Sequence, residues 1–360
     1  DPNVIGIQYT YDPNWPNKFK TVIDPRGKIT SYDYDGNGNL IKITYPTVAT
    51  NLGNRTPIAE FTYNTFGQLD TAKSVDGILS KYIYYSTQGD VNNFGHLWKK
   101  IVDYNETDAN ALNITTEYEY DRVGNIIEIT DPNGNPTKFR YSMTDLLEET
   151  ENPLSQITTY TYTPNKKIKT ISRTLGAQTQ TTTYAYDILD NLKSITGPLG
   201  SQYKTVYGYT KNEDPNIATD AELHDTVSQY DERGLLRSVT DANDNITQYS
   251  YDKNGNLKTI TDPNSNITTY YYDPFGRLIV IKYPDYSNEI FSYDKNSNLL
   301  SKINRAWQII SYEYDALNRL AVVNRPGEPN IVYTYDIAGR VDHVNDRGNI
   351  TEFYYDSEED

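Results

Sequence analysis

The chain has 360 residues, 36% of them hydrophobic, a formal net charge of −16 and no cysteine. These values exclude a disulfide-stapled scaffold and a thiolate metal site, and the negative charge argues against a nucleic-acid partner or an acidic membrane surface. No apolar run reaches the roughly 18 residues of a membrane span, so no membrane insertion is expected. The 35 tyrosines supply large apolar rings instead of aliphatic side chains, which indicates a folded chain.

A pair of aromatic residues two positions apart recurs from the N-terminus to the C-terminus. Between Tyr230 and Tyr335 a Tyr-Asp pair returns every 21 residues. A fixed period of this length indicates one small unit repeated many times. The second member of the aromatic pair is Tyr11, Tyr34, Tyr63, Tyr84, Tyr120, Tyr141, Tyr162, Tyr186, Tyr209, Tyr251, Tyr272, Tyr293, Tyr314, Tyr335 and Tyr355.

One unit, residues 251–272, shows the local structure that the repeat predicts. Its sequence YDKNGNLKTITDPNSNITTYYY holds two Asp/Asn-rich turn segments, 252–256 and 262–266. Each turn segment is followed by a run of β-branched and aromatic residues, 257–261 and 267–272, typical of strands. Each unit is therefore expected to be a β-hairpin.

The sequence shows clearly which side chains share a face in one strand of the unit, but not in the other. The aromatic pairs lie two residues apart, so both rings share one face, and we expect neighbouring hairpins to align them as an aromatic ladder. In the other strand Leu257 and Ile260 are three residues apart and cannot share a face in a regular strand. Either a β-bulge or burial on both faces would explain this spacing.

Three segments depart from the template. We expect loop insertions near residues 46–60 and 85–117, and a divergent repeat at 210–230, where Ser228 replaces the first aromatic residue. Long loops on a repeat scaffold are common sites of function, and equally common sites of neutral variation. Residues 1–360 are otherwise expected to be a single continuous array of about 16 repeats.

The unit resembles the YD repeat, also called the Rhs repeat. Matching copies include YDRVGN (120–125), DPNGN (131–135) and YDGNGN (34–39), and the resemblance covers nearly the whole chain. Members include Rhs and wall-associated proteins, the shell components of insecticidal toxin complexes, and teneurins. The resemblance implies a secreted or cell-surface protein whose repeats coil into a hollow β-shell around another polypeptide. The chain begins Asp1-Pro2 without methionine, so we expect it to be part of a longer protein.

Strand spacing leads to the same architecture without the resemblance. About 16 hairpins give roughly 30 strands, and at about 4.8 Å each they would form a flat sheet about 150 Å wide. Open twisted sheets of more than about ten strands curl or split, and a curl of this size is too wide for its side chains to fill. We expect an all-β fold in which tandem hairpins form one long curled antiparallel sheet.

The residues that carry most enzyme chemistry do not converge in the sequence. His96, His224 and His343 are isolated, and no nucleophile elbow or nucleotide-binding glycine loop is present. Residues 273–277 (DPFGR) resemble a motif of the family's self-cleaving members, but they lie inside an ordinary repeat and are interpreted as a turn. We expect no catalytic residue and no cofactor.

The Asp-x-Asn-x-Asn segments resemble the start of a calcium loop. None supplies both the glycine at position six and the glutamate at position twelve that an EF-hand requires. Asx-turns explain them, so no metal site is predicted.

The resulting functional prediction is a non-catalytic extracellular scaffold that encloses or displays another polypeptide. Two alternatives stay open. Trp15, Trp98 and Trp307 fall outside the aromatic ladder and are candidate glycan contacts of a surface adhesin. Open strand edges would instead permit self-association into an extracellular fibre.

Overall fold

The chain folds into 33 strands and one short 3₁₀ helix in the computed structural model, which describes residues 6–50, 52–86, 94–106, 111–176 and 178–355. The first third contains β1 (Gln8–Tyr11), β2 (Phe19–Ile23), β3 (Ile29–Tyr34), β4 (Leu40–Thr44), β5 (Val48–Thr50), β6 (Gly53–Arg55), β7 (Ile58–Tyr63), β8 (Leu69–Lys73), β9 (Leu79–Tyr84), β10 (Leu97–Val102) and β11 (Ile114–Tyr120). The middle contains β12 (Ile126–Thr130), β13 (Pro136–Tyr141), β14 (Leu147–Glu151), β15 (Ile157–Tyr162), β16 (Ile168–Leu175), β17 (Gln178–Tyr186), β18 (Leu192–Thr196), η1 (Ser201–Tyr203), β19 (Lys204–Tyr209), β20 (Pro215–Thr219), β21 (Asp225–Tyr230) and β22 (Leu236–Thr240). The last third contains β23 (Ile246–Tyr251), β24 (Leu257–Thr261), β25 (Ile267–Tyr272), β26 (Leu278–Lys282), β27 (Asn288–Tyr293), β28 (Leu299–Ile303), β29 (Ile309–Tyr314), β30 (Leu320–Arg325), β31 (Glu328–Tyr335), β32 (Val341–Asp346) and β33 (Asn349–Glu352).

All strands except β5 and β6 form one antiparallel sheet of 31 strands, in which each strand pairs with its neighbours in sequence. This confirms the predicted fold class. Within this sheet, connections from an odd- to an even-numbered strand follow the repeat tyrosines and lie along one edge, here called the YD rim. Connections from an even- to an odd-numbered strand lie along the opposite edge, here called the DP rim.

The turns have one recurring geometry, which Asp252 illustrates. Its carboxylate accepts the backbone N–H groups of Asn254 and Asn256 at 2.8 and 2.9 Å, and the Asn256 side-chain amide at 3.0 Å. Gly255 then takes a φ of 87°, which closes the turn. The first Asp and the last Asn of the pattern therefore bond to each other within the turn, as the Asx-turn interpretation predicted.

A β-bulge accounts for the irregular spacing of the aliphatic strand. Ser250 pairs with Thr259 but Tyr251 pairs with Leu257, so one extra residue of β24 is accommodated there. Because cross-strand partners share a face, Leu257 and Ile260 both lie beside the aromatic pair. Of the two alternatives left open by the sequence, the bulge is the one that occurs.

The repeat tyrosine has a specific hydrogen bond. The Tyr293 hydroxyl donates to the Leu278 carbonyl oxygen at 2.8 Å, just outside the β26–β27 pairing, which begins at Val280. Equivalent bonds recur along the sheet at Tyr34, Tyr63, Tyr84, Tyr162, Tyr186, Tyr209, Tyr230, Tyr335 and Tyr355. The motif therefore selects tyrosine over phenylalanine for its hydroxyl as well as for its ring.

The expected ring-on-ring ladder is wrong in detail. Within the described residues, ring–ring contacts occur only near β1–β2 and around β7–β12, for example between Tyr9 and Phe19 at 4.8 Å. Elsewhere an aliphatic strand lies between successive aromatic strands, as where Tyr270 pairs with Ile281. The half-buried rings therefore pack against leucine and isoleucine of the neighbouring strand.

The opposite face of the sheet is polar. Hydroxyl pairs connect adjacent strands, such as Ser250 with Thr259 and Thr161 with Thr170, both at 2.6 Å. Ion pairs between neighbouring strands, such as Lys99 with Glu117, accompany them. The sheet is thus a single layer with one aromatic–aliphatic face and one polar face.

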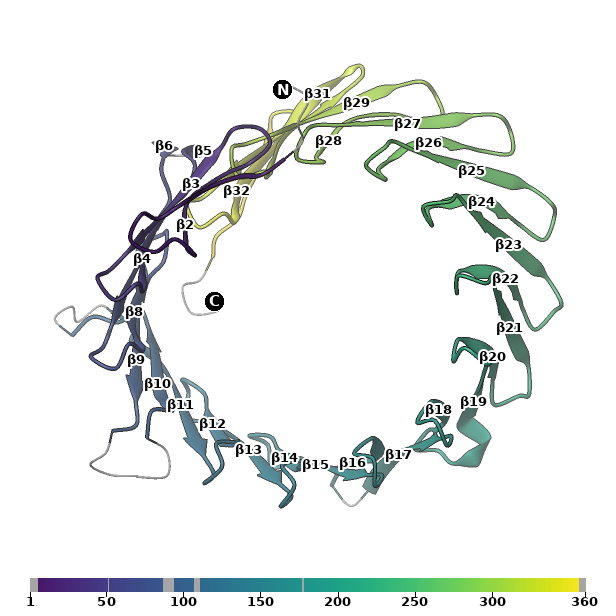
Figure 1. Ribbon diagram of the computed structural model, residues 1–360, viewed down its shortest axis with the longest axis horizontal. Helices are drawn as coiled ribbons and strands as arrows, with labels where there is room; N and C mark the ends of the chain where they lie inside the picture. The colour runs from purple at the N-terminus through teal and green to yellow at the C-terminus, as the bar shows by residue number, and fades with distance from the viewer. Residues whose placement is uncertain (1–5, 51, 87–93, 107–110, 177, 356–360) are drawn as a thin grey trace.

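The sheet curls into a ring whose two ends overlap (Figure 1). The β2–β3 connection meets the β27–β28 and β29–β30 connections, so the main sheet from β3 to β28 completes one revolution. Roughly two dozen strands at about 4.8 Å give a circumference of ~115 Å and a diameter of ~37 Å. A side-chain layer is only about 5 Å deep on each wall, so a central space of roughly 25 Å remains.

Candidate functional site

The most distinctive site is the overlap where the second revolution meets the first. The Asn296 side-chain amide donates to the Asp24 carboxylate at 2.7 Å, although 272 residues separate them. The Arg26 guanidinium donates to the Asp315 carbonyl oxygen at 2.8 Å and lies 3.8 Å from the Asp294 carboxylate. The DP rim of the first revolution therefore docks on the YD rim of the second through polar side chains.

The segment 46–60 forms a second part of this overlap. It contains the small β5–β6 hairpin, in which Val48 is buried, and β5 contacts β31 of the second revolution. Residues 46–60 thus contain a folded hairpin that contacts the second revolution, and their assignment as an insertion stays a prediction.

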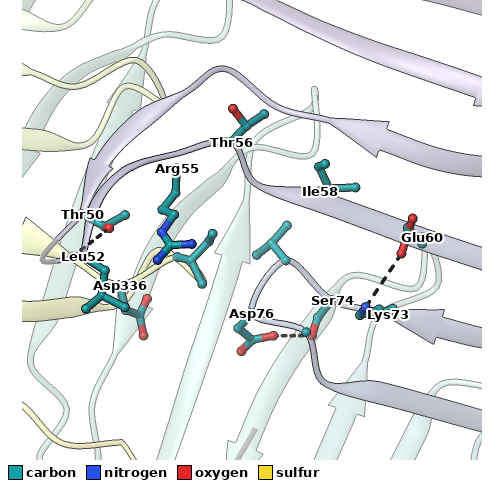
Figure 2. A pocket seen from close by; sticks show the side chains of 13 residues that line it. Thr50, Leu52, Arg55, Thr56, Ile58, Glu60, Lys73, Ser74, Asp76 and Asp336 are labelled. Atoms are coloured by element: carbon teal, nitrogen blue, oxygen red, sulfur yellow. Dashed lines mark hydrogen bonds and ion pairs between the residues drawn. The ribbon is translucent and has the colours of Figure 1, made fainter.

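A groove of 560 Å³ lies beside that hairpin (Figure 2). Its walls come from β5–β8, from the β8–β9 connection around Asp76, and from Asp336 and Ile337 of the β31–β32 connection. Figure 2 shows the Arg55 side chain extending into the groove, with Glu60 and Lys73 paired at its edge. The groove is therefore the space between the two stacked rims.

The three tryptophans are not brought together. Trp15 lies in the β1–β2 connection, packed over Gly38 with the Lys18 ammonium 5.4 Å from its ring centroid. Trp98 is on β10, 4.3 Å from the Lys99 ammonium. Trp307 is 67% exposed at the tip of the β28–β29 connection on the DP rim. They do not form a shared sugar-binding platform, and a role for each in glycan binding stays a prediction.

Residues 273–277 form a YD-rim turn. Arg277 donates to the Asp273 carboxylate at 2.7 Å and to the Asp294 carbonyl at 2.8 Å, and its guanidinium lies 5.0 Å from the Tyr293 ring centroid. Burial opposes ionisation of Asp273, but the hydrogen bonds from Arg277 lower its pKa overall. These contacts tie one repeat to the next, which is a structural role.

The histidines lie apart from one another. His96 sits edge-on to Tyr120 at 4.6 Å and over Gly124, where an added Cβ would lie 2.8 Å from its ring. His224 and His343 contact the carboxylates of Asp220 and Asp342 at 3.2 and 2.8 Å. Among the residues that the structure describes, no group of three or more potential ligands is arranged to hold a metal ion.

Two pKa directions recur in the wall. The side-chain hydrogen bond from Asn256, helped by backbone N–H donors, holds the pKa of Asp252 below its ordinary value. Burial acts in the opposite direction but does not outweigh these hydrogen bonds. Burial raises the pKa of Tyr272, with smaller contributions from Tyr270 and Asp252. The turns thus favour charged aspartates, and the wall favours neutral tyrosines.

Sequence reasoning did not identify the overlap residues Asp24, Arg26 and Asn296. Each occupies an ordinary turn position, and the contact depends on how many strands make one revolution. The only signal was the insertion at 46–60. The second insertion is less informative, because residues 87–93 and 107–110 lie outside the described residues.

Across the described residues, no helix has the length and hydropathy that crossing a membrane requires.

Two family models match three segments of the sequence. The teneurin YD-shell model matches residues 209–360, and the RHS repeat model matches residues 20–50 and 120–151. No curated protein sequence matches the chain significantly.

Solved structures share the fold at low sequence identity. The crystal structure of TcdB2-TccC3 is 15% identical with a TM-score of 0.69, and covers 94% of this chain but 20% of its own. A Photorhabdus luminescens Tc holotoxin pore is 15% identical with a TM-score of 0.59, and covers 98% of this chain and 22% of its own. The chain thus spans about one fifth of these toxin chains. The repeat and the two matching models thus identify residues 20–50, 120–151 and 209–360 as YD (RHS) repeats, so the chain is similar to the YD-repeat (RHS-repeat) family over these residues.

Proposed function

We propose that residues 1–360 act as one continuous, non-catalytic wall that encloses or displays another polypeptide, in a secreted or cell-surface protein. The observation that carries the proposal is the overlap of the two ends, which turns an open sheet into a ring around a central space. The similarity to a Tc holotoxin pore and to the teneurin YD-shell supports the secreted or surface setting.

The mechanism is steric. Continuous strand pairing leaves no gap between neighbouring strands, and the lateral bonds of turns such as Arg277 to Asp294 hold successive repeats together. A polypeptide inside a space of roughly 25 Å would be separated from proteases by a layer about 10 Å thick. No reaction is needed for this role.

Cross-linking of two introduced cysteines tests whether the ring is closed. The chain contains no native cysteine, so only the introduced thiols can react. In the variant Asp24→Cys/Asn296→Cys we expect a short bismaleimide to link the two thiols within one molecule with high yield. In the matched control Asp24→Cys/Asn165→Cys the second thiol lies in the β15–β16 connection, far around the ring from β2 and β3, and should not cross-link (Figure 1). Equal and low yields in both variants would show an open array.

Enclosure is tested separately with a flexible polypeptide fused after residue 360. If the wall encloses it, proteolysis of the fused segment should be several-fold slower than that of the same peptide added in trans. Equal cleavage rates together with efficient cross-linking would leave the ring intact and refute enclosure.

The adhesin alternative now rests mainly on Trp307, whose ring is the most exposed of the three tryptophans. Stacking of one sugar ring on it predicts weak binding, because none of the ring–ring contacts among the described residues involves Trp307.

A further inference from the structure

The turns of the sheet contain the three Asn-Gly pairs of the chain, which are residues 37–38, 133–134 and 254–255. Asparagine followed by glycine is prone to spontaneous deamidation, because glycine has no side chain to hinder its own backbone nitrogen. That nitrogen attacks the side-chain carbonyl carbon of the asparagine, a C–N bond forms, and the side-chain nitrogen leaves as ammonia. Water then opens the resulting succinimide at either carbonyl and leaves aspartate or isoaspartate. The reaction requires no reagent other than water.

The same turn geometry restrains all three pairs. In each turn the glycine N–H donates to the carbonyl oxygen of the leading aspartate, at 3.0, 2.9 and 3.2 Å in chain order. The glycine nitrogen attacks only after it loses this proton, so the hydrogen bond must first open. Deamidation in the folded chain therefore proceeds through local opening of the turn.

The three turns differ in what covers the glycine. Gly134 is exposed and Gly255 is half-buried, and among the described residues no atom lies within 4 Å of a Cβ built on either. Gly38 is buried, and a Cβ built on it would lie 3.1 Å from the Trp15 ring and 3.0 Å from the Lys18 ammonium. The same ammonium donates to the Gly38 carbonyl oxygen and lies 5.4 Å from the centroid of the Trp15 ring. Trp15 and Lys18 thus form a cap over the first of the three pairs.

We propose that Asn133 and Asn254 are sites of spontaneous conversion to isoaspartate in the folded protein, and that the Trp15–Lys18 cap protects Asn37. This modification is independent of the proposed enclosing role. Conversion inserts the side-chain methylene into the backbone and adds one negative charge. The longer backbone no longer fits the spacing at which Asp252 accepts the N–H groups two and four residues further on, at 2.8 and 2.9 Å. Each conversion therefore loosens its turn.

Peptide mapping by mass spectrometry, after incubation of the folded chain at mildly alkaline pH, measures all three sites in one sample. We expect Asn133 to convert faster than Asn254. Asn37 should convert about tenfold more slowly than Asn133, because its turn must also release a hydrogen bond and a stacked ring to open. In urea the three rates should become similar, because only the local sequence then distinguishes them. Equal rates at Asn37 and Asn133 in the folded chain, or an unchanged ranking in urea, would overturn the proposal.

Substitutions in the cap test its protecting role. Trp15→Ala should raise the conversion rate of Asn37 several-fold and leave that of Asn133 unchanged, and Lys18→Met should act in the same direction by removing the hydrogen bond to Gly38. The control Phe275→Ala removes a 61% exposed ring from another YD-rim turn and should leave all three rates unchanged. An unchanged Asn37 rate in both cap variants, or an equal rise at all three sites, would refute protection by the cap.

Discussion

At the scale of single residues, the repeat tyrosine contributes a hydrogen bond that phenylalanine cannot replace. Tyr293→Phe removes the bond to the Leu278 carbonyl while keeping the ring in place. We expect a loss of about 1 kcal/mol in the free energy of unfolding, measured by urea denaturation. Tyr271→Phe is the matched control, since Tyr271 is 48% exposed, and it should change stability little. Equal losses in both variants would assign the effect to the ring environment.

At the scale of elements, the turns depend on one left-handed residue each. Gly255 and Ser265 occupy equivalent positions with φ of 87° and 66°. No atom lies within 4 Å of a Cβ placed on Gly255, so Gly255→Ala tests backbone strain alone, and we expect it to cost about 1 kcal/mol. Ser265→Gly should be neutral or stabilising by a few tenths of a kcal/mol. Thermal unfolding of the two variants compares them, and destabilisation by Ser265→Gly would contradict this account.

At the scale of the whole molecule, the tyrosines predict sensitivity to alkaline pH. Burial raises the pKa of Tyr141, Tyr272, Tyr335 and other repeat tyrosines above the ordinary value near 10. The folded state therefore binds these protons more tightly than the unfolded state. Their contribution to stability is complete below about pH 10 and is lost as the pH rises through the higher folded values. Part of the tyrosinate absorbance should thus rise together with the loss of circular dichroism, and ionisation of all 35 tyrosines with the circular dichroism retained would contradict this.

The sequence by itself determined the hairpin unit and the continuous pairing. Aromatic residues two apart define a strand face, and Asp-led turns close on their own backbone, so both are settled within about 21 residues. The choice between a bulge and two-sided burial around Leu257 required the register of the paired strands. The register was also needed to show that aliphatic strands alternate with aromatic strands. The residue spacing within one strand does not show which side chains of the neighbouring strand lie beside it.

Only the tertiary structure decided which residues meet where the ring overlaps. The partners Asp24 and Asn296 lie 272 residues apart, and their meeting depends on the curl accumulated over every strand between them. A small change in twist per strand, summed around the ring, would move the contact to another turn with the same local sequence. The sequence therefore determined a curled wall of hairpins, and the summed twist and curvature determined where that wall closes.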